Sequence, residues 1–295
     1  MKNLFDTYVH LWPVSSHAQL KPLFSQLDVV HYPGEFTAIA SVKKPQSTVV
    51  VTKAAKTKDL IDLAYKGFEH FVQQDRDDFY QELLVSGLMA LRPKAFSDNP
   101  IPFFFTGFAP PQSSKTMSAN LVQEFKSSKT KTLVIDRLHT FLGQAKYLSR
   151  IRDLCVQVAD EMITNACFSA PMLANGQRLF QKVDRKSEVV LPGGHSAILF
   201  ATFTEQKVII GCQDPFGSLN RAELLAHLRG VYRSEQVTPK DTAGAGFGMK
   251  YMIDNCSSFY AYVEKGQKTL VACSFQVGSL KKNLNDERHL HLSLR

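Results

Sequence analysis

Two different patterns of strand-like and helix-like segments follow one another along this chain of 295 residues. Over residues 4–91, strand-like runs alternate with stretches whose apolar residues recur at helical spacing. This alternation predicts a parallel sheet covered by helices. From residue 132 onward, long helical patterns are followed by strand pairs with short turns, which predict an antiparallel sheet with helices on one face. We therefore expect an α/β domain followed by an α+β two-layer sandwich.

The individual elements of the N-terminal part follow from local signals. We expect strands over residues 4–11, 29–32, 47–52 and 68–72, and helices over residues 16–27, 57–67 and 77–91. Ser16 is a plausible N-cap, and Gly67 is a C-terminal stop. The C-terminal part is expected to hold helices over residues 147–166, 221–229 and 250–255, and strands over residues 189–191, 196–203, 207–211, 258–263 and 269–276.

Residues 97–131 are rich in turn-forming residues, apart from the apolar run 103–108, which is expected to pack on one of the domains. The predicted organisation is a first domain over residues 1–110, a linker over 111–131 and a second domain over 132–295.

Three short segments in the second domain are candidates for chemistry. They are Glu161-x-x-x-Asn165, Asp214-Pro-Phe-Gly217 and Gly244-Ala-Gly-Phe-Gly248. Two side chains four residues apart on a helix meet one turn above the other. A carboxylate at a strand end accepts hydrogen bonds from an exocyclic amine such as that of adenine. Glycines just before a helix expose backbone N–H groups that suit phosphate.

Each of the three segments also has a simpler interpretation. Glu161 is also interpretable as a surface acid and Asn165 as a hydrogen-bonded core amide. Asp214 is also interpretable as a turn residue, and the glycines as a flexible loop. Found in this order, the three segments together indicate a pocket for a nucleotide and its metal.

The three segments resemble the conserved boxes of the histidine-kinase-like ATPases, which include sensor histidine kinases, anti-sigma-factor serine kinases and gyrase B. The resemblance covers residues 130–280. It implies ATP and Mg²⁺ as ligands, Asn165 as the metal ligand and Glu161 as the general base. It also implies adenine contacts from Asp214, Gly217 and Thr269, and a phosphate loop containing Gly244, Gly246 and Gly248.

Two further features bear on this resemblance. The second box usually reads Asp-x-Gly-x-Gly, whereas here one glycine is shifted and the other is absent. The segment between Asp214 and Gly244 would be the lid over the nucleotide.

The first domain resembles a degenerate receiver domain, a flavodoxin-like α/β fold. The run from Lys58 to Val72 is similar to the late helix and strand of that fold. The third strand ends in Thr52-Lys53 where the receiver family has a phospho-accepting aspartate. The resemblance therefore implies a module that docks a partner or dimerises without being phosphorylated in the usual way.

Composition restricts the class of protein. No run of 18 apolar residues occurs, and the N-terminus lacks the apolar segment of a secretory signal, so we expect a cytoplasmic protein without a membrane span. The five cysteines form no C-x-x-C pair and read as buried hydrophobes. The net charge of +8 is spread thinly and comes with no nucleic-acid motif, which argues against a nucleic-acid partner.

The C-terminal residues 286–294 alternate like an edge strand. His289 and His291 share one face of it, but no further ligand accompanies them and metal binding there is not expected.

These features together indicate a bacterial signalling protein that binds ATP with Mg²⁺. The expected chemistry is that of a protein kinase or ATPase acting on a partner protein, in the manner of an anti-sigma serine kinase, and a homodimer is compatible with it. The alternative is a non-catalytic scaffold that has a degenerate nucleotide pocket. The altered second box favours this alternative, whereas the Glu161/Asn165 pair favours the enzyme.

Overall fold

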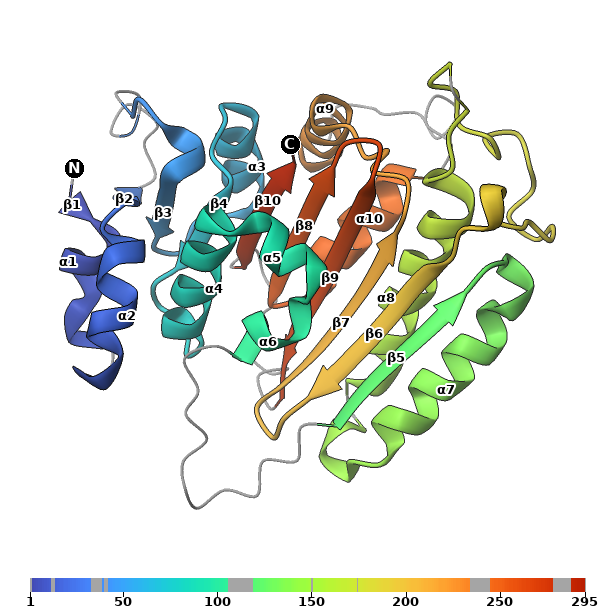
Figure 1. The fold of residues 1–295 in the computed structure, drawn as a ribbon, viewed down its shortest axis with the longest axis horizontal. Helices are drawn as coiled ribbons and strands as arrows, with labels where there is room; N and C mark the ends of the chain where they lie inside the picture. Colours follow the sequence, from blue (N-terminus) through green and yellow to red (C-terminus); the bar gives the residue numbers. More distant parts are fainter. Residues whose placement is uncertain are drawn as a thin grey trace. The chain divides into compact units, whose positions relative to one another are not determined.

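The computed structural model of the protein describes residues 2–11, 14–32, 39, 42–105, 119–149, 151–173, 175–233, 245–277 and 288–294. It shows a mixed α/β protein whose chain forms two compact units (Figure 1). Unit 1 comprises Met1–Ser114 and Asn285–Ser293, and unit 2 comprises Lys115–Leu284 with Leu294–Arg295.

This division differs from the predicted one at two places. The C-terminal segment, predicted to belong to the second domain, joins unit 1 through residue 293. Residues 119–125, predicted to be linker, form a strand of unit 2. Both differences arise because a strand is placed by the neighbour it pairs with, which can lie far away in the sequence.

Unit 1 contains five strands and six α-helices among its described residues. The strands are β1 (Lys2–Asn3), β2 (Asp28–Tyr32), β3 (Thr48–Thr52), β4 (His70–Gln73) and β10 (His289–Leu294, whose last residue is assigned to unit 2). The helices are α1 (Leu4–Tyr8), α2 (Val14–Phe24), α3 (Thr57–Tyr65), α4 (Phe79–Leu91), α5 (Pro93–Asp98) and α6 (Pro100–Phe105), with 3-10 turns at Val9–Leu11 and Pro45–Ser47.

The predicted parallel arrangement is confirmed for the centre of unit 1. Strands β2, β3 and β4 are parallel neighbours, with Val29 opposite Val49 and Val50 opposite Phe71. Strand β1 pairs antiparallel with β2, and β10 pairs antiparallel with β4. The order within the unit is therefore β1-β2-β3-β4-β10.

The core of unit 1 forms because alternate strand residues point to opposite faces. Val49, Val51 and Val72 pack with apolar residues of α1, α2 and α4 in one buried cluster. Val50 and Phe71 point to the other face and are also fully buried.

The prediction of a strand over residues 4–11 is wrong. Residues 4–8 form α1, because the side chain of Asn3 accepts a hydrogen bond from the Asp6 N–H at 2.8 Å and caps the helix. Leu4 and Tyr8, four residues apart, are both buried on the face that meets the core. Local capping and helical spacing therefore outweigh the apolar, strand-like composition.

The strand predicted at the C-terminus is confirmed, and its two histidines are fully buried. His289 Nε2 lies 2.9 Å from Asp78 Oδ1, and its Nδ1 accepts the Gln73 N–H at 3.0 Å. His291 Nε2 lies 3.2 Å from Glu82 Oε2. Each histidine thus contacts a carboxylate at or near the start of α4, and the pairing satisfies polar groups that burial would otherwise penalise.

Unit 2 contains five strands and four α-helices among its described residues. The strands are β5 (Ala119–Phe125), β6 (Ala197–Phe203), β7 (Lys207–Asp214), β8 (Ser258–Glu264) and β9 (Lys268–Gln276). The helices are α7 (Lys131–Gly143), α8 (Arg152–Thr164), α9 (Arg221–Tyr232) and α10 (Ala245–Asn255), with 3-10 turns at Ser128–Thr130, Lys146–Leu148 and Pro192–Gly194 and a π-helical turn at Asn165–Ser169.

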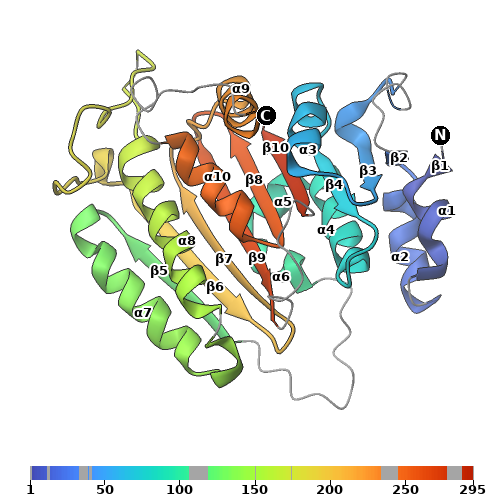
Figure 2. The same cartoon turned by 180° about the vertical axis from the view of Figure 1, so that it is seen from behind.

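The expected antiparallel sheet with helices on one face is confirmed for unit 2. All neighbouring strands in the order β8-β9-β7-β6-β5 run antiparallel, and β6–β7 and β8–β9 are the two predicted hairpins. Helices α7, α8 and α10 lie side by side across one face of these strands (Figure 2).

Two predicted elements of unit 2 differ in extent. The helix expected over residues 147–166 is regular only over Arg152–Thr164 and continues as the π-helical turn. Residues 189–191 do not form a strand but make a single bridge between Val190 and Ser127, because Pro192 follows at once.

No helix in the described parts of either unit is long and apolar enough to cross a membrane. All five cysteines are buried and free, as predicted.

Candidate functional site

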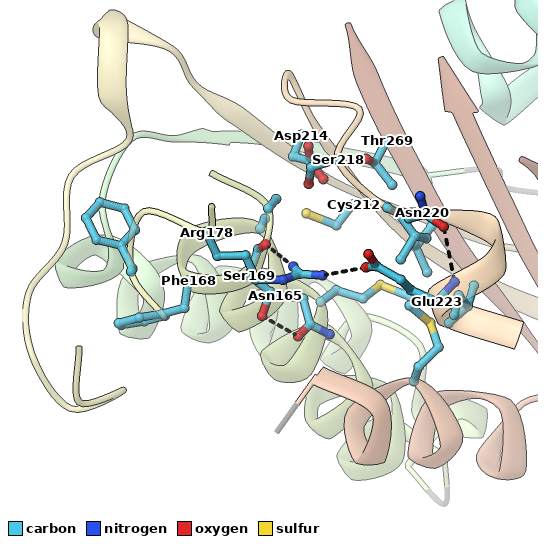
Figure 3. A pocket seen from close by; sticks show the side chains of 18 of the residues that line it. Asn165, Phe168, Ser169, Arg178, Cys212, Asp214, Ser218, Asn220, Glu223 and Thr269 are labelled. Atoms are coloured by element: carbon cyan, nitrogen blue, oxygen red, sulfur yellow. Dashed lines mark hydrogen bonds and ion pairs between the residues drawn. The ribbon is translucent and has the colours of Figure 1, made fainter. Parts of the chain in front are cut away.

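A cavity of about 690 Å³ opens in unit 2 between α8, its π-helical extension, β7, β9, α9 and α10. This volume lies within the range of about 300–1,000 Å³ that is typical of small-molecule sites. The polar and charged lining residues include Asn165, Ser169, Arg178, Gln181, Arg185, Asp214, Ser218, Asn220, Glu223, His227 and Thr269. Apolar lining residues include Met162, Phe168, Phe180, Leu224, Met249, Met252 and Val271. Figure 3 shows the labelled members of this set around the cavity.

The π-helical turn shapes one wall of the cavity. Here the Ala170 N–H donates to the Asn165 carbonyl oxygen at 2.9 Å, five residues back instead of four. Such turns widen a helix locally and are frequent at functional sites. The turn contributes Asn165, Phe168 and Ser169 to the lining.

The Asn165 amide is incompletely paired. The Ser169 hydroxyl donates to its Oδ1 at 3.5 Å, the upper limit of a hydrogen bond. Its Nδ2 is buried and has no hydrogen-bond partner among the described residues. An unpaired buried donor costs about 1–3 kcal/mol, so this group is suited to a partner that the protein does not supply.

Glu161 lies one turn before Asn165 and is not among the residues that line the cavity. Its Oε1 lies 3.8 Å from Arg185 Nη1, and its carboxylate packs against α10. Burial raises the pKa of Glu161, while the positive charge of Arg185 and the neighbouring Asn165 amide oppose this rise. The Asn165 amide lowers the pKa of Glu161 by lying close to its carboxylate, although Asn165 Nδ2 does not meet the geometry of a hydrogen bond.

Gly248 makes this packing of Glu161 possible. A Cβ atom at Gly248 would lie 1.8 Å from Glu161 Oε1, much closer than any real contact. Gly248 therefore allows α8 and α10 to approach, a role that differs from the predicted phosphate loop.

The predicted loop itself is not found in the described residues. Helix α10 begins at Ala245, so Gly246 and Gly248 lie within its first turn. Gly244 lies outside the described residues.

Asp214 is the last residue of β7 and is almost fully buried. The Phe216 N–H donates to its Oδ1 at 3.0 Å. Burial raises the pKa of Asp214 from its ordinary value of 3.8 to about 7, against the opposing effect of hydrogen bonds from Phe216 and Gly217. A carboxylate that is half protonated near neutral pH is unusual and marks a candidate functional group.

Thr269 is the register partner of Asp214 on β9, so the two side chains share one end of the cavity. The Thr269 hydroxyl also lowers the pKa of Asp214. Its geometry nevertheless falls short of a hydrogen bond, and the buried Oγ1 has no such partner among the described residues. This end of the cavity therefore presents an acid and an unpaired hydroxyl together.

Gly217 has a different role from the predicted one. Its φ is 55°, a left-handed conformation that favours glycine. A Cβ atom there would lie 2.1 Å from the carbonyl oxygen of Glu264, and the Gly266 N–H donates to the Gly217 carbonyl at 3.1 Å. Gly217 thus packs the strand end onto the β8–β9 turn and is not a lining residue.

The structure therefore brings Asn165, Asp214 and Thr269 together around one cavity. Glu161, Gly217 and Gly248 are neighbours of this cavity rather than lining residues.

Residues 175–188 contribute Arg178, Phe180, Val183 and Arg185 to the lining, and no sequence pattern predicted this. This segment follows neither helical nor strand spacing, so only the fold reveals it. The methionines Met162, Met249 and Met252 were detectable as parts of the apolar stripes on α8 and α10. Within the predicted lid, residues Arg221–Tyr232 form α9, and residues 234–244 lie outside the described part of the chain.

The cavity combines a buried acid with a hydroxyl and an amide donor that lack hydrogen-bond partners among the described residues. The chain matches no protein-family model, and a search of curated proteins finds no match either.

Proposed function

We propose that unit 2 binds an adenine nucleotide with Mg²⁺, with the fold and ligand arrangement of the histidine-kinase-like ATPases. The observation that carries this proposal is the convergence of Asn165, Asp214 and Thr269 around one cavity of about 690 Å³. Asn165 Nδ2 and Thr269 Oγ1 have no hydrogen-bond partner among the described residues, and Asp214 is buried with a raised pKa.

The base would lie at the Asp214 end of the cavity. An ionised Asp214 accepts a hydrogen bond from the exocyclic amine of adenine, and the Thr269 hydroxyl bonds a ring nitrogen. The apolar residues Leu224, Met252 and Val271 would then enclose the faces of the purine. Guanine carries an oxygen in place of that amine, so the same carboxylate disfavours it.

The phosphates would extend towards Asn165. Mg²⁺ prefers oxygen ligands and is usually held by few protein groups together with substrate phosphates. The Asn165 amide fits this requirement when its Oδ1 faces the cavity, an orientation related to the present one by a flip of the amide. The described residues contain no cluster of three or more His, Cys, Asp or Glu side chains that could hold a metal alone. When bound, Mg²⁺ would neutralise phosphate charge.

The chemistry that we propose is phosphoryl transfer to a partner protein. An oxygen or nitrogen of the partner side chain bonds to the γ-phosphorus, the bond to the leaving ADP oxygen breaks, and Glu161 takes the proton of the attacking group. The raised pKa of Glu161 brings it closer to the working range of a general base.

One observation favours the alternative of a non-catalytic scaffold that is regulated by nucleotide. The Glu161 carboxylate faces Arg185 and α10 instead of the cavity. For transfer, Glu161 would have to turn towards the phosphates.

For unit 1 we propose a receiver-like docking module. The three parallel strands β2, β3 and β4 are in keeping with a receiver-like fold. At the end of β3, the Thr52 hydroxyl donates a hydrogen bond to Gln73 Oε1 at 2.7 Å. A neutral, buried residue whose hydroxyl is already used is not suited to accept a phosphoryl group, which leaves docking as the role that we propose.

The test combines calorimetric titration with transfer assays. Wild-type protein should bind Mg-ATP with saturation and prefer it to Mg-GTP, and ATP at 100 times its dissociation constant should stabilise the fold by about 2.7 kcal/mol. No binding at millimolar ATP would reject the proposal. Glu161→Gln should keep ATP binding and lose transfer or hydrolysis, whereas Glu205→Gln, at an exposed turn, should keep both. Wild-type protein that binds but never turns over ATP would favour the scaffold.

A further inference from the structure

Residues 171–173 and 175–188 close one side of the cavity, and backbone hydrogen bonds fix the first part of this segment. The Leu179 N–H donates to the Pro171 carbonyl oxygen at 2.9 Å, and the Leu173 N–H donates to the Gln177 carbonyl oxygen at 2.8 Å. These bonds hold the two ends of a short loop together, so the side chain of Arg178 leaves from a defined position. The same segment carries Arg185 to the cavity.

Arg178 reaches across the cavity between two elements. One of its terminal nitrogens, Nη1, donates to the Ser169 carbonyl oxygen in the π-helical turn. The other, Nη2, lies 4.0 Å from Glu223 Oε2 on α9. Figure 3 shows the guanidinium between these groups, with Asp214 and Thr269 on one side and Asn165 on the other. It therefore lies between the proposed base end and the proposed metal end.

Arg185 has a similar environment near Glu161. Its side chain is 38% exposed, and its Nη1 lies 3.8 Å from Glu161 Oε1. Both arginine–carboxylate distances exceed the length of a hydrogen bond, about 2.7–3.2 Å. Glu223 is 72% exposed, so water screens its charge. These ion pairs are therefore weak, and a more highly charged anion can replace the carboxylates.

We propose that Arg178 and Arg185 bind the phosphate groups of the nucleotide and exchange Glu223 and Glu161 for phosphate oxygens. This inference rests on the proposed function, because it assumes an adenine nucleotide in the same cavity. A planar guanidinium matches the oxygens of a phosphate with two parallel hydrogen bonds, which are stronger than a bond between neutral groups. The predicted glycine loop is largely replaced by helix in the described residues, and the two arginines supply the positive charge at this end of the cavity.

The exchange has a consequence for Glu161. With Arg185 on a phosphate, the Glu161 carboxylate loses its ion pair with Arg185, keeps only the weaker attraction of Lys131, and can turn from α10 towards the cavity. Phosphate binding would thus release the proposed base, and nucleotide without its terminal phosphates would leave it paired.

The test separates the arginines from the base end by using ligands with and without phosphate. Arg178→Gln and Arg185→Gln are titrated calorimetrically with ATP, with adenosine and with inorganic tripolyphosphate, at one fixed ionic strength. Lys186→Gln is the matched control, because the substitution removes the same charge next to Arg185 and Lys186 does not line the cavity. Thermal unfolding without ligand checks that each variant is folded.

Each arginine variant should weaken ATP and tripolyphosphate binding about 10- to 100-fold and leave adenosine binding within twofold of wild type. Lys186→Gln should change none of them beyond the small effect of net charge. ATP affinity that stays unchanged in both arginine variants would overturn this inference and leave the proposed function standing. Equal losses for ATP and adenosine would overturn it in favour of a purely structural role. Wild-type protein that binds neither adenosine nor ATP would refute the proposed function, and binding of tripolyphosphate alone would show an anion site without a nucleotide.

Discussion

Asp214 can be tested by a substitution that should stabilise the fold and impair binding together. Asp214→Asn keeps the shape of the side chain and an oxygen that accepts the Phe216 N–H, but it removes the buried charge. The pKa of Asp214 is raised from 3.8 to about 7 by burial. At 1.36 kcal/mol per pKa unit, the ionised form is disfavoured in the folded protein by about 4 kcal/mol.

The sign of the effect follows from proton linkage. Between about pH 4 and pH 7 the folded protein keeps a proton on Asp214 that the unfolded chain has lost. The free energy of unfolding of wild-type protein therefore falls as pH rises through this window, by up to about 4 kcal/mol. Asp214→Asn lacks this contribution, so its stability relative to wild type should grow by up to the same amount between pH 4 and pH 8.

Urea unfolding followed by circular dichroism at several pH values measures this difference. Asp153→Asn, which removes an exposed carboxylate from α8, is the control and should follow the wild-type curve closely. Parallel stability curves for wild type and Asp214→Asn would refute the reasoning about burial.

The same variant tests the role of Asp214 in binding. Losing a charge-assisted hydrogen bond to the adenine amine should weaken ATP binding by about 1.5–3 kcal/mol, or roughly 10- to 150-fold. Wild-type affinity should also fall as pH drops below about 7, because protonation removes the negative charge that strengthens the hydrogen bond to the adenine amine. Undiminished ATP affinity in Asp214→Asn would exclude Asp214 from recognition of the base.

Four other substitutions probe the site and the two units. Thr269→Val and Thr202→Val each replace a buried hydroxyl that lacks a partner among the described residues, so each should raise the free energy of unfolding by about 1 kcal/mol. Only Thr269→Val should weaken ATP binding in calorimetry, because Thr269 lines the cavity. Equal ATP affinity in both variants would remove Thr269 from the site. Gly217→Ala should destabilise by about 3 kcal/mol or more in urea unfolding, since its Cβ would lie 2.1 Å from a backbone oxygen, and an unchanged midpoint would contradict this packing. Burial lowers the pKa of His291 below 6.5, so the free energy of unfolding of the wild type should fall as pH drops below that value. In His291→Gln this fall should be smaller. An equally steep fall in the variant would exclude His291 as its cause.

Local signals were sufficient where one pattern dominates. The run Val49-Val50-Val51 predicted β3 because three β-branched residues in a row suit a strand buried on both faces. The hairpins β6–β7 and β8–β9 followed from short polar turns between apolar runs. Once these strands pair, Asp214 and Thr269 must face each other, so this end of the cavity was within reach of the sequence.

Long-range packing decided the remaining features. The glycine run reads as a loop, yet its described part belongs to α10, where Gly248 leaves room for the Glu161 side chain of α8. The pairing of β10 with β4 joins residues more than 200 positions apart, and no local sequence pattern predicts it. Arg178 and Arg185 come from a segment without periodicity, and only their position in the fold shows that they face the cavity.

Hydrogen–deuterium exchange with and without Mg-ATP tests most directly whether three distant segments surround one nucleotide. We expect slower exchange on ATP addition in peptides that cover residues 162–170, 212–224 and 269–271, and no change in the unit 1 peptides from β2 to β4. At an ATP concentration that just saturates the wild type, this protection should be much weaker in Asp214→Asn. Protection confined to other parts of the chain, or none at saturating ATP, would contradict a nucleotide site in this cavity.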